Sequence, residues 1–300
     1  VVARPIGSGG GTTSEMLLSS NGSELERVEM RQMKQGGAMA APVKVGLNIV
    51  WAKPEHLLEF AQAAEELGYE SVWSGEHVSL PFKPDWGRNR PGASAAADAP
   101  EDWPGDETPM PFGPDSIFLD PLIALAHIAA VTKRVRLGIG IYMLALRDAV
   151  LVGRTLASLD VLSGGRLDLA TGLGWVKEEY WYTGNDWSAR GRRCNEMIRA
   201  LRVLFEEEHP EFHGEFFDFD PIGFQPKPVQ RPMPIHIGGG GPPAIKRAAT
   251  LGNGWYGMPE AIPEIERLRA EAGRGGEPFE YSAITPVSYT HLTLPTILRV

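Results

Sequence analysis

The stretch Pro234-Ile235-His236-Ile237-Gly238-Gly239-Gly240-Gly241-Pro242-Pro243-Ala244-Ile245 leads a short apolar run into four glycines and two prolines. This order is typical of a strand, a tight glycine turn and a helix. Glycines allow successive backbone N–H groups to approach an anion, and proline suits the first position of a helix. The positive N-terminus of that helix favours a phosphate. We therefore expect a phosphate cradle at Gly238, Gly239, Gly240 and Gly241, with a flexible loop tip as the alternative.

The bulk composition narrows the class of ligand. The chain has 300 residues, 43% of them hydrophobic, and a formal net charge of −9. This charge argues against nucleic acid and against an anionic membrane surface, so we expect a small-molecule substrate. The single cysteine, Cys194, excludes an internal disulfide framework and fits the cytoplasm. We also expect no membrane span and no signal peptide. The sequence leaves a homodimer as one possibility for the oligomeric state.

Both ends of the chain differ in character from its centre. Residues 1–40 are rich in Gly, Ser, Met and charged side chains and show no sustained periodicity, so we interpret them as disordered or leader-derived. Residues 287–300 include a run that resembles one reading frame of a sequencing adapter, which predicts a non-native tail, with a genuine β-prone tail as the alternative. The predicted folded domain is therefore residues 43–286.

Apolar strands alternate with amphipathic helices across that domain. Strands are predicted at residues 43–50, 71–74, 135–141 and 167–171, in the opening stretch, and at 254–258 and 279–285. Helices are predicted at about 54–67, 121–131, 148–163, 190–207, 243–251 and 262–272. A long loop is expected over residues 79–118 and a small β excursion over 212–224.

This alternation predicts a parallel sheet, either a doubly wound sheet or a (β/α)₈ barrel. Chemically reactive side chains follow nearly every strand, which favours the barrel because all its strands end at one mouth. Only seven strands are predicted where a barrel needs about eight. We therefore expect an α/β fold, a TIM-like barrel with an inserted segment, that is incomplete at its C-terminus and leaves two exposed sheet edges.

Several segments resemble the luciferase-like monooxygenase superfamily, in the family's order. They include SVWSGEHVSLP, RLGIGIYMLALR, LDVLSGGRLDLATGLGWVKEEY, ARGRRCNE and LGNGWYG, and the branch that depends on coenzyme F-420 is the most similar. The resemblance implies a TIM-like barrel that binds coenzyme F-420, a deazaflavin, or alternatively FMN. The cofactor ring would lie over the barrel mouth, with its phosphate at residues 238–241.

Glu76 and His77 end the second predicted strand, where relatives carry an acid–histidine pair beside the flavin. A neutral histidine can move a proton near physiological pH, and an adjacent carboxylate can tune it. The resemblance makes His77 and Glu76 candidate catalytic residues, with a capping pair at a loop start as the alternative. Gly140 and Ile141 match the place where many relatives have a non-prolyl cis peptide that supports the cofactor ring; ordinary packing is the alternative for Gly140.

Gly172, Gly174 and Trp175 follow the fourth strand, where the backbone is expected to approach the cofactor and Trp175 to contact ring or substrate. A core tryptophan is the alternative. Some relatives carry a glutamate at this turn, but Trp175 occupies it here. The sequence therefore assigns no second catalytic acid, and neither Glu178 nor Glu179 is chosen.

Other charged residues are expected to be structural. Arg190, Arg193 and Glu196 match the family's R-x-x-R-x-x-E pattern and are interpreted as salt-bridge or capping groups. Arg147 lies in an ALRDA stretch that departs from the family's pattern, which leaves its loop without a predicted shape. The remaining histidines, His127, His213 and His236 among them, show no metal-ligand spacing, so no metal site is predicted.

The sequence thus favours an oxidoreductase that transfers a hydride between F-420 and a small organic substrate, with His77 handling the proton. An FMN-dependent monooxygenase that uses oxygen is the close alternative. A protein that binds flavin or F-420 without catalysis is an alternative of another class. A metal-dependent barrel hydrolase is disfavoured because His and Asp ligands do not cluster at the strand ends.

Overall fold

Short apolar strands alternate with helices along the described chain, as the periodicity predicts. The computed structural model describes residues 44–82, 112–289 and 292–299, so most of the predicted 79–118 loop and all of the predicted leader lie outside the described residues. The elements in chain order are β1 (Lys44–Asn48), η1 (Pro54–His56), α2 (Leu57–Leu67), β2 (Ser71–Ser74), α3 (Pro121–Val131), β3 (Arg136–Tyr142), η3 (Leu144–Leu146), α4 (Ala149–Ser163), β4 (Leu167–Thr171), α5 (Lys177–Tyr182), α6 (Arg190–Glu206), β5 (Phe212–His213), β6 (Asp218–Phe219), β7 (Ile235–Gly238), α7 (Pro242–Leu251), β8 (Gly254–Tyr256), η4 (Pro259–Ala261), α8 (Ile262–Glu271), β9 (Glu280–Tyr289) and β10 (Leu292–Arg299).

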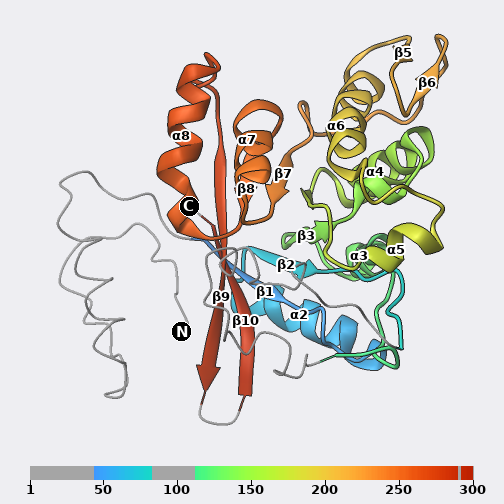
Figure 1. Ribbon diagram of the computed structural model, residues 1–300. Helices are drawn as coiled ribbons and strands as arrows, with labels where there is room; N and C mark the ends of the chain where they lie inside the picture. The colour runs from blue at the N-terminus through green and yellow to red at the C-terminus, as the bar shows by residue number, and fades with distance from the viewer. Residues whose placement is uncertain (1–43, 83–111, 290–291, 300) are drawn as a thin grey trace, which may run out of the picture. The chain divides into compact units, whose positions relative to one another are not determined.

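Seven strands run parallel and form the wall of a barrel (Figure 1). Parallel ladders join β1 to β2, β2 to β3, β3 to β4, β4 to β7, β7 to β8 and β8 to β9. These are the predicted strands with shifted ends, and the TIM-like fold is confirmed. Because parallel strands end at the same rim, the segments that follow β2, β3, β4 and β7 meet at one mouth.

An antiparallel strand, β10, closes the ring. It pairs with β9, where Leu292 lies opposite Tyr289, and with β1, where Arg299 lies opposite Lys44. The expectation of two exposed sheet edges is therefore wrong, because β10 covers both. No eighth parallel strand follows β9 in the part of the chain that is described, so the parallel portion is incomplete as predicted. That residues 287–300 are non-native stays a prediction.

Capping residues that can be recognised in the sequence mark the ends of several helices. The Asp120 side chain accepts hydrogen bonds from two backbone N–H groups in the first turn of α3, and the Asp148 side chain accepts one from an N–H group of α4. Gly68 and Gly164 end α2 and α4 with φ angles of 84° and 70°, a conformation that glycine adopts without a Cβ penalty. Among the described helices, none combines the length and the apolar character that crossing a membrane requires.

Two stacked aromatic rings fill the barrel beneath its mouth. Trp73 of β2 and Tyr256 of β8 are buried, with ring centroids 5.0 Å apart. Glycines of β3 make the room: a Cβ on Gly138 would lie 2.1 Å from the Trp73 ring, and one on Gly140 2.2 Å from Tyr256 Oη. Strand β3 can therefore pass close to both rings only because these positions lack side chains.

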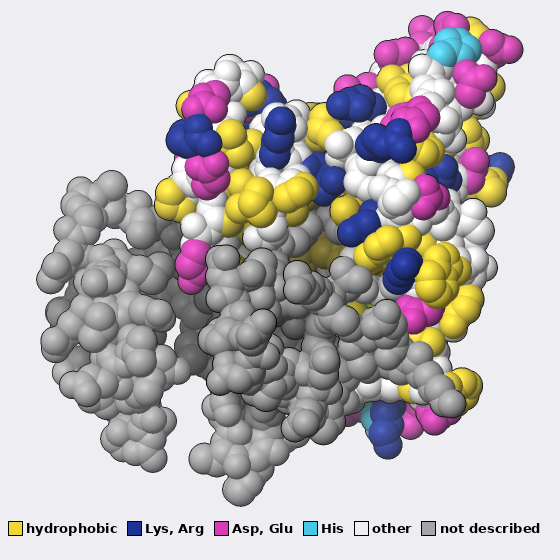
Figure 2. Space-filling view, in the orientation of Figure 1, with side chains coloured by type: hydrophobic (Ala, Val, Ile, Leu, Met, Phe, Trp, Pro, Cys, Tyr) yellow, Lys and Arg dark blue, Asp and Glu magenta, His cyan; other side chains and the backbone are white. Residues whose placement is uncertain are grey.

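The β5–β6 hairpin forms a separate two-stranded sheet inside the predicted 212–224 excursion. His213 lies there between two carboxylates, 2.9 Å from Glu211 and 2.5 Å from Asp218. Figure 2 shows acidic side chains gathered around a histidine over these strands. The hairpin is thus an acidic surface element that surrounds one titratable imidazole.

Candidate active site

His77 lies just beyond the end of β2, and aromatic rings enclose it. The centroid of its ring lies 5.3 Å from that of Phe112, 5.1 Å from Phe118 and 5.4 Å from Trp175. Trp51, which follows β1, stacks on Phe112 with centroids 5.3 Å apart. The His77 side chain is only 11% exposed. The imidazole is therefore held in a largely apolar surrounding, where hydrogen bonds are stronger than in water.

The carboxylate that faces His77 belongs to Glu179. Both Glu179 oxygens lie within reach of His77 Nδ1, at 3.3 and 3.4 Å, and the Val78 N–H donates to Oε1 at 2.6 Å. Glu179 comes from α5, a short helix that the sequence analysis missed, and its side chain is fully buried. The only sequence signal was the pair of acids after Trp175, which does not indicate which of them turns inward.

Glu76, the acid adjacent to His77 in sequence, points elsewhere. Its carboxylate receives hydrogen bonds from the Arg147 guanidinium at 2.5 and 3.0 Å and from the Met143 N–H at 2.6 Å. Burial raises the pKa of Glu76, and Arg147 and the Met143 N–H offset part of the rise. Contrary to what was expected, Glu76 therefore does not tune His77 through a direct contact. Its hydrogen bonds instead join the segment after β2 to the segment after β3.

Arg193 of α6 fixes that same segment from the other side. It donates to the carbonyl oxygens of Ala145 and Arg147 at 2.9 and 3.0 Å. Glu196, one turn further along α6, accepts the N–H groups of Phe216 and Phe217 at 2.7 and 2.8 Å. These contacts agree with the structural roles that were expected for the R-x-x-R-x-x-E pattern, and they define the loop around Arg147.

The candidate cofactor residues of β3, β4 and β7 come together around Ile141. The Gly140–Ile141 peptide is cis, as the resemblance implies. A Cβ on Gly172 would lie 3.1 Å from Ile141 Cδ1, and one on Gly238 2.4 Å from Ile141 Cγ2. On the side of His77, a Cβ on Gly75 would lie 3.2 Å from Gly140 O. The chain at the ends of β4 and β7 therefore packs closely against the Ile141 side chain, and the chain after β2 packs against the Gly140 backbone.

The turn after β4 brings Trp175 to His77 rather than into the barrel core. Gly174 has a φ of +69°, and a Cβ there would lie 2.3 Å from Met143 Sδ. Only glycine combines this backbone conformation with so close a neighbour. The turn therefore directs Trp175 to the mouth, edge-on to the His77 ring at an interplanar angle of 84°.

A buried hydroxyl near the cis peptide has no hydrogen-bond partner among the described residues. Tyr256 Oη is buried, and it is the atom closest to where a Gly140 side chain would be. Burial raises the pKa of Tyr256, so this phenol stays protonated at neutral pH. An orphaned buried polar atom costs free energy. The floor of the mouth therefore fits a ligand with a polar group, as a flavin or deazaflavin ring has.

The glycine turn between β7 and α7 fits an anion through its glycines. Gly239 has a φ of +138° and is exposed, as is Gly240, and Gly241 is the N-cap of α7. Pro242 and Pro243 open the helix and have no N–H to donate. A phosphate here would be held by glycine N–H groups, and α7 would add the favourable potential of its N-terminus.

The described residues contain no group of three or more His, Cys, Asp or Glu side chains that could hold a metal ion. His213 bonds to hairpin carboxylates, and His236 is buried in the wall of the barrel with Glu280 3.5 Å away. Among the described residues, the ion-pair partners of His213 and His236 are carboxylates and not a second histidine.

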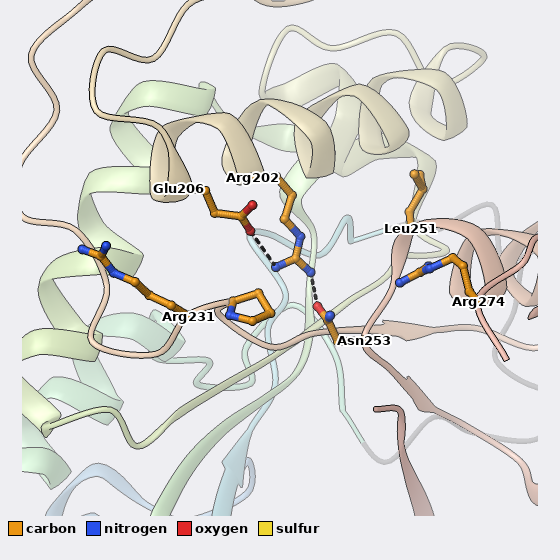
Figure 3. A pocket seen from close by; sticks show the side chains of 7 residues that line it. Arg202, Glu206, Arg231, Leu251, Asn253 and Arg274 are labelled. Atoms are coloured by element: carbon orange, nitrogen blue, oxygen red, sulfur yellow. Dashed lines mark hydrogen bonds and ion pairs between the residues drawn. The ribbon is translucent and has the colours of Figure 1, made fainter. Parts of the chain in front are cut away.

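A cavity of about 490 Å³ lies at the opposite rim, where β7, β8 and β9 begin (Figure 3). Arg202 reaches into it from α6, donates to Met233 O at 2.7 Å and bonds to Asn253. Arg274 donates to Ala249 O and Gly252 O at 3.1 and 3.0 Å. None of the residues that line this cavity is a candidate active-site residue, so the cavity is separate from that site.

The parallel barrel has a cis peptide between Gly140 and Ile141, near the end of β3, and a glycine turn after β7. The chain belongs to the luciferase-like monooxygenase family, whose sequence profile matches residues 30–291. Its relatives include an F-420-dependent dehydrogenase, an FMNH(2)-dependent monooxygenase and uncharacterized proteins.

Three relatives illustrate this range. An uncharacterized protein of Mycobacterium tuberculosis is 32% identical over 240 residues, which is 78% of this chain and 77% of that protein. The F-420-dependent glucose-6-phosphate dehydrogenase of Amycolatopsis mediterranei is 29% identical over 209 residues, 67% of this chain and 53% of the enzyme. The FMNH(2)-dependent dimethylsulfone monooxygenase of Pseudomonas putida is 34% identical over 134 residues, 42% of this chain and 37% of the enzyme.

Among solved structures, a monooxygenase from Streptomyces bottropensis superposes with a TM-score of 0.59 at 26% identity, over 77% of this chain. The chain spans 66% of that solved protein. The shared barrel is therefore shown.

Proposed function

We propose that this protein is an oxidoreductase that transfers a hydride between coenzyme F-420 and a small organic substrate. The observation that carries the proposal is the packing of Gly172 and Gly238 against Ile141 of the cis peptide, with Gly75 leading from that point to His77. This backbone would hold a cofactor ring near His77, and the turn at residues 238–241 would hold its phosphate.

The bound cofactor would supply the redox chemistry, accepting or releasing a hydride at its ring. Backbone at Gly140, Ile141 and Gly172 would support the ring, and Tyr256 Oη would supply a hydrogen-bonding group beneath it. Glycine N–H groups at residues 238–241 would bind the phosphate. His77 would take the proton from a substrate hydroxyl or return it, since imidazole is suited to proton transfer near neutral pH.

The rings around His77 support an apolar substrate. Phe112, Phe118, Trp51 and Trp175 come from three different segments, and their faces offer contact to carbon rather than to charge. These rings would also exclude water while the proton moves. A small alcohol or carbonyl compound with an apolar substituent fits this surrounding better than a phosphorylated one.

An FMN-dependent monooxygenase is the second candidate. It is supported by the FMNH(2)-dependent dimethylsulfone monooxygenase, which is 34% identical to this chain over 134 residues. The same cradle and cis peptide would hold FMN. The two candidates differ in oxygen use, since the deazaflavin ring lacks the nitrogen that favours reaction with oxygen.

Parallel titration of F-420 and FMN separates them. We expect tight binding of F-420, followed by its fluorescence and absorbance, and weaker binding of FMN. The reverse preference, together with oxygen consumption during turnover, would move the assignment to the monooxygenase. Failure of both cofactors to bind would overturn the cradle itself.

His77→Ala separates an enzyme from a carrier. We expect F-420 affinity to be retained and turnover to fall on the order of 10²- to 10⁴-fold, the usual contribution of a general acid or base. Wild-type protein that binds F-420 tightly yet turns over no alcohol or carbonyl compound of a broad panel would instead indicate a cofactor carrier. A cytoplasmic location and a homodimer stay predictions.

A further inference from the structure

Glu179 holds one particular nitrogen of the His77 ring. Its two oxygens lie 3.3 and 3.4 Å from Nδ1, while the Val78 and Ser79 N–H groups donate to Oε1 at 2.6 and 3.5 Å. The Glu179 side chain is fully buried, so these groups take the place of water around it. One carboxylate thus binds the imidazole and the backbone that follows it.

The chemistry of the carboxylate decides where the imidazole proton lies. An ionised carboxylate only accepts hydrogen bonds. The backbone N–H groups can only donate, and they fit the ionised form. His77 Nδ1 must therefore carry a hydrogen when it bonds to Glu179. In the neutral ring, this leaves the lone pair on Nε2.

We propose that Glu179 is the positioning residue for His77, which fixes the tautomer with the proton on Nδ1 and makes Nε2 the atom that exchanges a proton with the substrate. The proposal rests on the proposed function in taking His77 as the proton-transfer group. Glu76 is bonded instead to Arg147 and to the Met143 N–H, whereas Glu179 bonds the His77 ring. The aromatic rings of Phe112, Phe118 and Trp175 limit rotation of the ring away from Glu179.

The first test reads the tautomer directly, without cofactor or turnover. Protein labelled with ¹⁵N-histidine is examined by long-range ¹H–¹⁵N NMR at a pH where the His77 ring is neutral, and the His77 signals are assigned from their loss in His77→Ala. We expect a protonated Nδ1 and a bare Nε2 in the wild type. In Glu179→Gln the side-chain amide can accept from Nδ1 or donate to it, so a mixture of tautomers is expected.

Glu196→Gln is the matched control. Glu196 is also a helix carboxylate that accepts backbone N–H groups from a distant segment, but it bonds the Phe216 and Phe217 N–H groups and not the His77 segment. The His77 tautomer should be unchanged in this variant. A wild-type spectrum with a bare Nδ1 would overturn the proposal by itself, even if Glu179→Gln failed to fold. So would a single unchanged tautomer in folded Glu179→Gln.

Kinetics then separate the two proposals. With F-420 and a substrate that the wild type turns over, Glu179→Gln should lower kcat on the order of 10- to 100-fold, while the substrate KM changes little. If the tautomer depends on Glu179 but His77→Ala turns over at the wild-type rate, the positioning stands and His77 loses its proposed role. If His77→Ala is inactive and the tautomer is independent of Glu179, His77 keeps its proposed role in proton transfer and the positioning by Glu179 is wrong.

Discussion

Gly140 is the residue at which the barrel floor and the candidate cofactor site touch. A Cβ there would lie 2.2 Å from Tyr256 Oη and 2.3 Å from Tyr256 Cζ, inside a buried stack with Trp73. Overpacking of this kind costs about 1–3 kcal/mol. We expect Gly140→Ala to lower the melting temperature and to weaken F-420 binding, because either Tyr256 or the strand end must shift.

Gly276→Ala is the control for that prediction. Gly276 has no atom within 4 Å of an added Cβ. Thermal denaturation and F-420 titration of both variants check the expectation. Equal melting temperatures for Gly140→Ala and Gly276→Ala would show that the contact with Tyr256 is not as tight as described.

At the same scale, the acid that contacts His77 is not the one that the sequence suggested. Adjacency in the chain suggested Glu76, whereas the contact is made by Glu179, 102 residues further along. Which carboxylate turns inward depends on how α5 packs after β4. A pattern of residue types along the chain does not contain that information.

Among the elements, the β5–β6 hairpin carries a pH-dependent contact. Hydrogen bonds from His213 to Asp218 and Glu211 raise the pKa of the imidazole above its ordinary value of 6.5. Since the folded pKa is the higher one, the ion pairs stabilise the hairpin fully below pH 6.5, and this stabilisation is lost as the pH rises through the folded pKa.

NMR titration of the His213 ring should therefore give a midpoint above 6.5, and Asp218→Asn should lower it toward that value. Because all three side chains are exposed to solvent, we expect salt to weaken the shift of the His213 pKa. A midpoint at or below 6.5 in the wild type would contradict the hydrogen bonds described for this hairpin.

The elements that the sequence predicted well have either a strong period or a clear cap. The α3 and α4 starts at Asp120 and Asp148 are examples. Helix α5 spans only six residues, Lys177–Tyr182, too short for a period to appear. Strand β10 differs from the favoured prediction for another reason: the adapter-like run favoured a non-native tail over the β-prone tail that was the alternative, whereas β10 pairs with β9 and β1.

For the molecule as a whole, β10 is the part of the barrel whose contribution is easiest to isolate. Its removal exposes the edges of β1 and β9, and unpaired edges promote association. We expect deletion of residues 292–299 to lower the melting temperature and to increase light scattering of the protein. Deletion of residues 1–40, which precede β1, is the control. Unchanged stability and scattering without β10 would mean that the parallel strands hold the barrel alone.

The global topology was predictable because it rests on few rules. Buried apolar strands that alternate with helices require parallel pairing, and parallel strands bring their ends to one rim. Closure of the ring was not predictable in this way, because Lys44 and Arg299 pair from opposite ends of the described chain. Nothing local in either segment indicates its partner.

Pro242 and Pro243 make the glycine turn unusually easy to observe by hydrogen–deuterium exchange. Two adjacent residues without amide hydrogens separate the glycine amides from those of Ala244 and Ile245, which already bond to Gly241 O. A bound phosphate should slow exchange at residues 239–241 and leave the helix amides as they were. The deuterium content of a peptide that spans this turn would therefore report whether phosphate is bound. The measurement needs neither the absorbance of a cofactor nor a variant with activity.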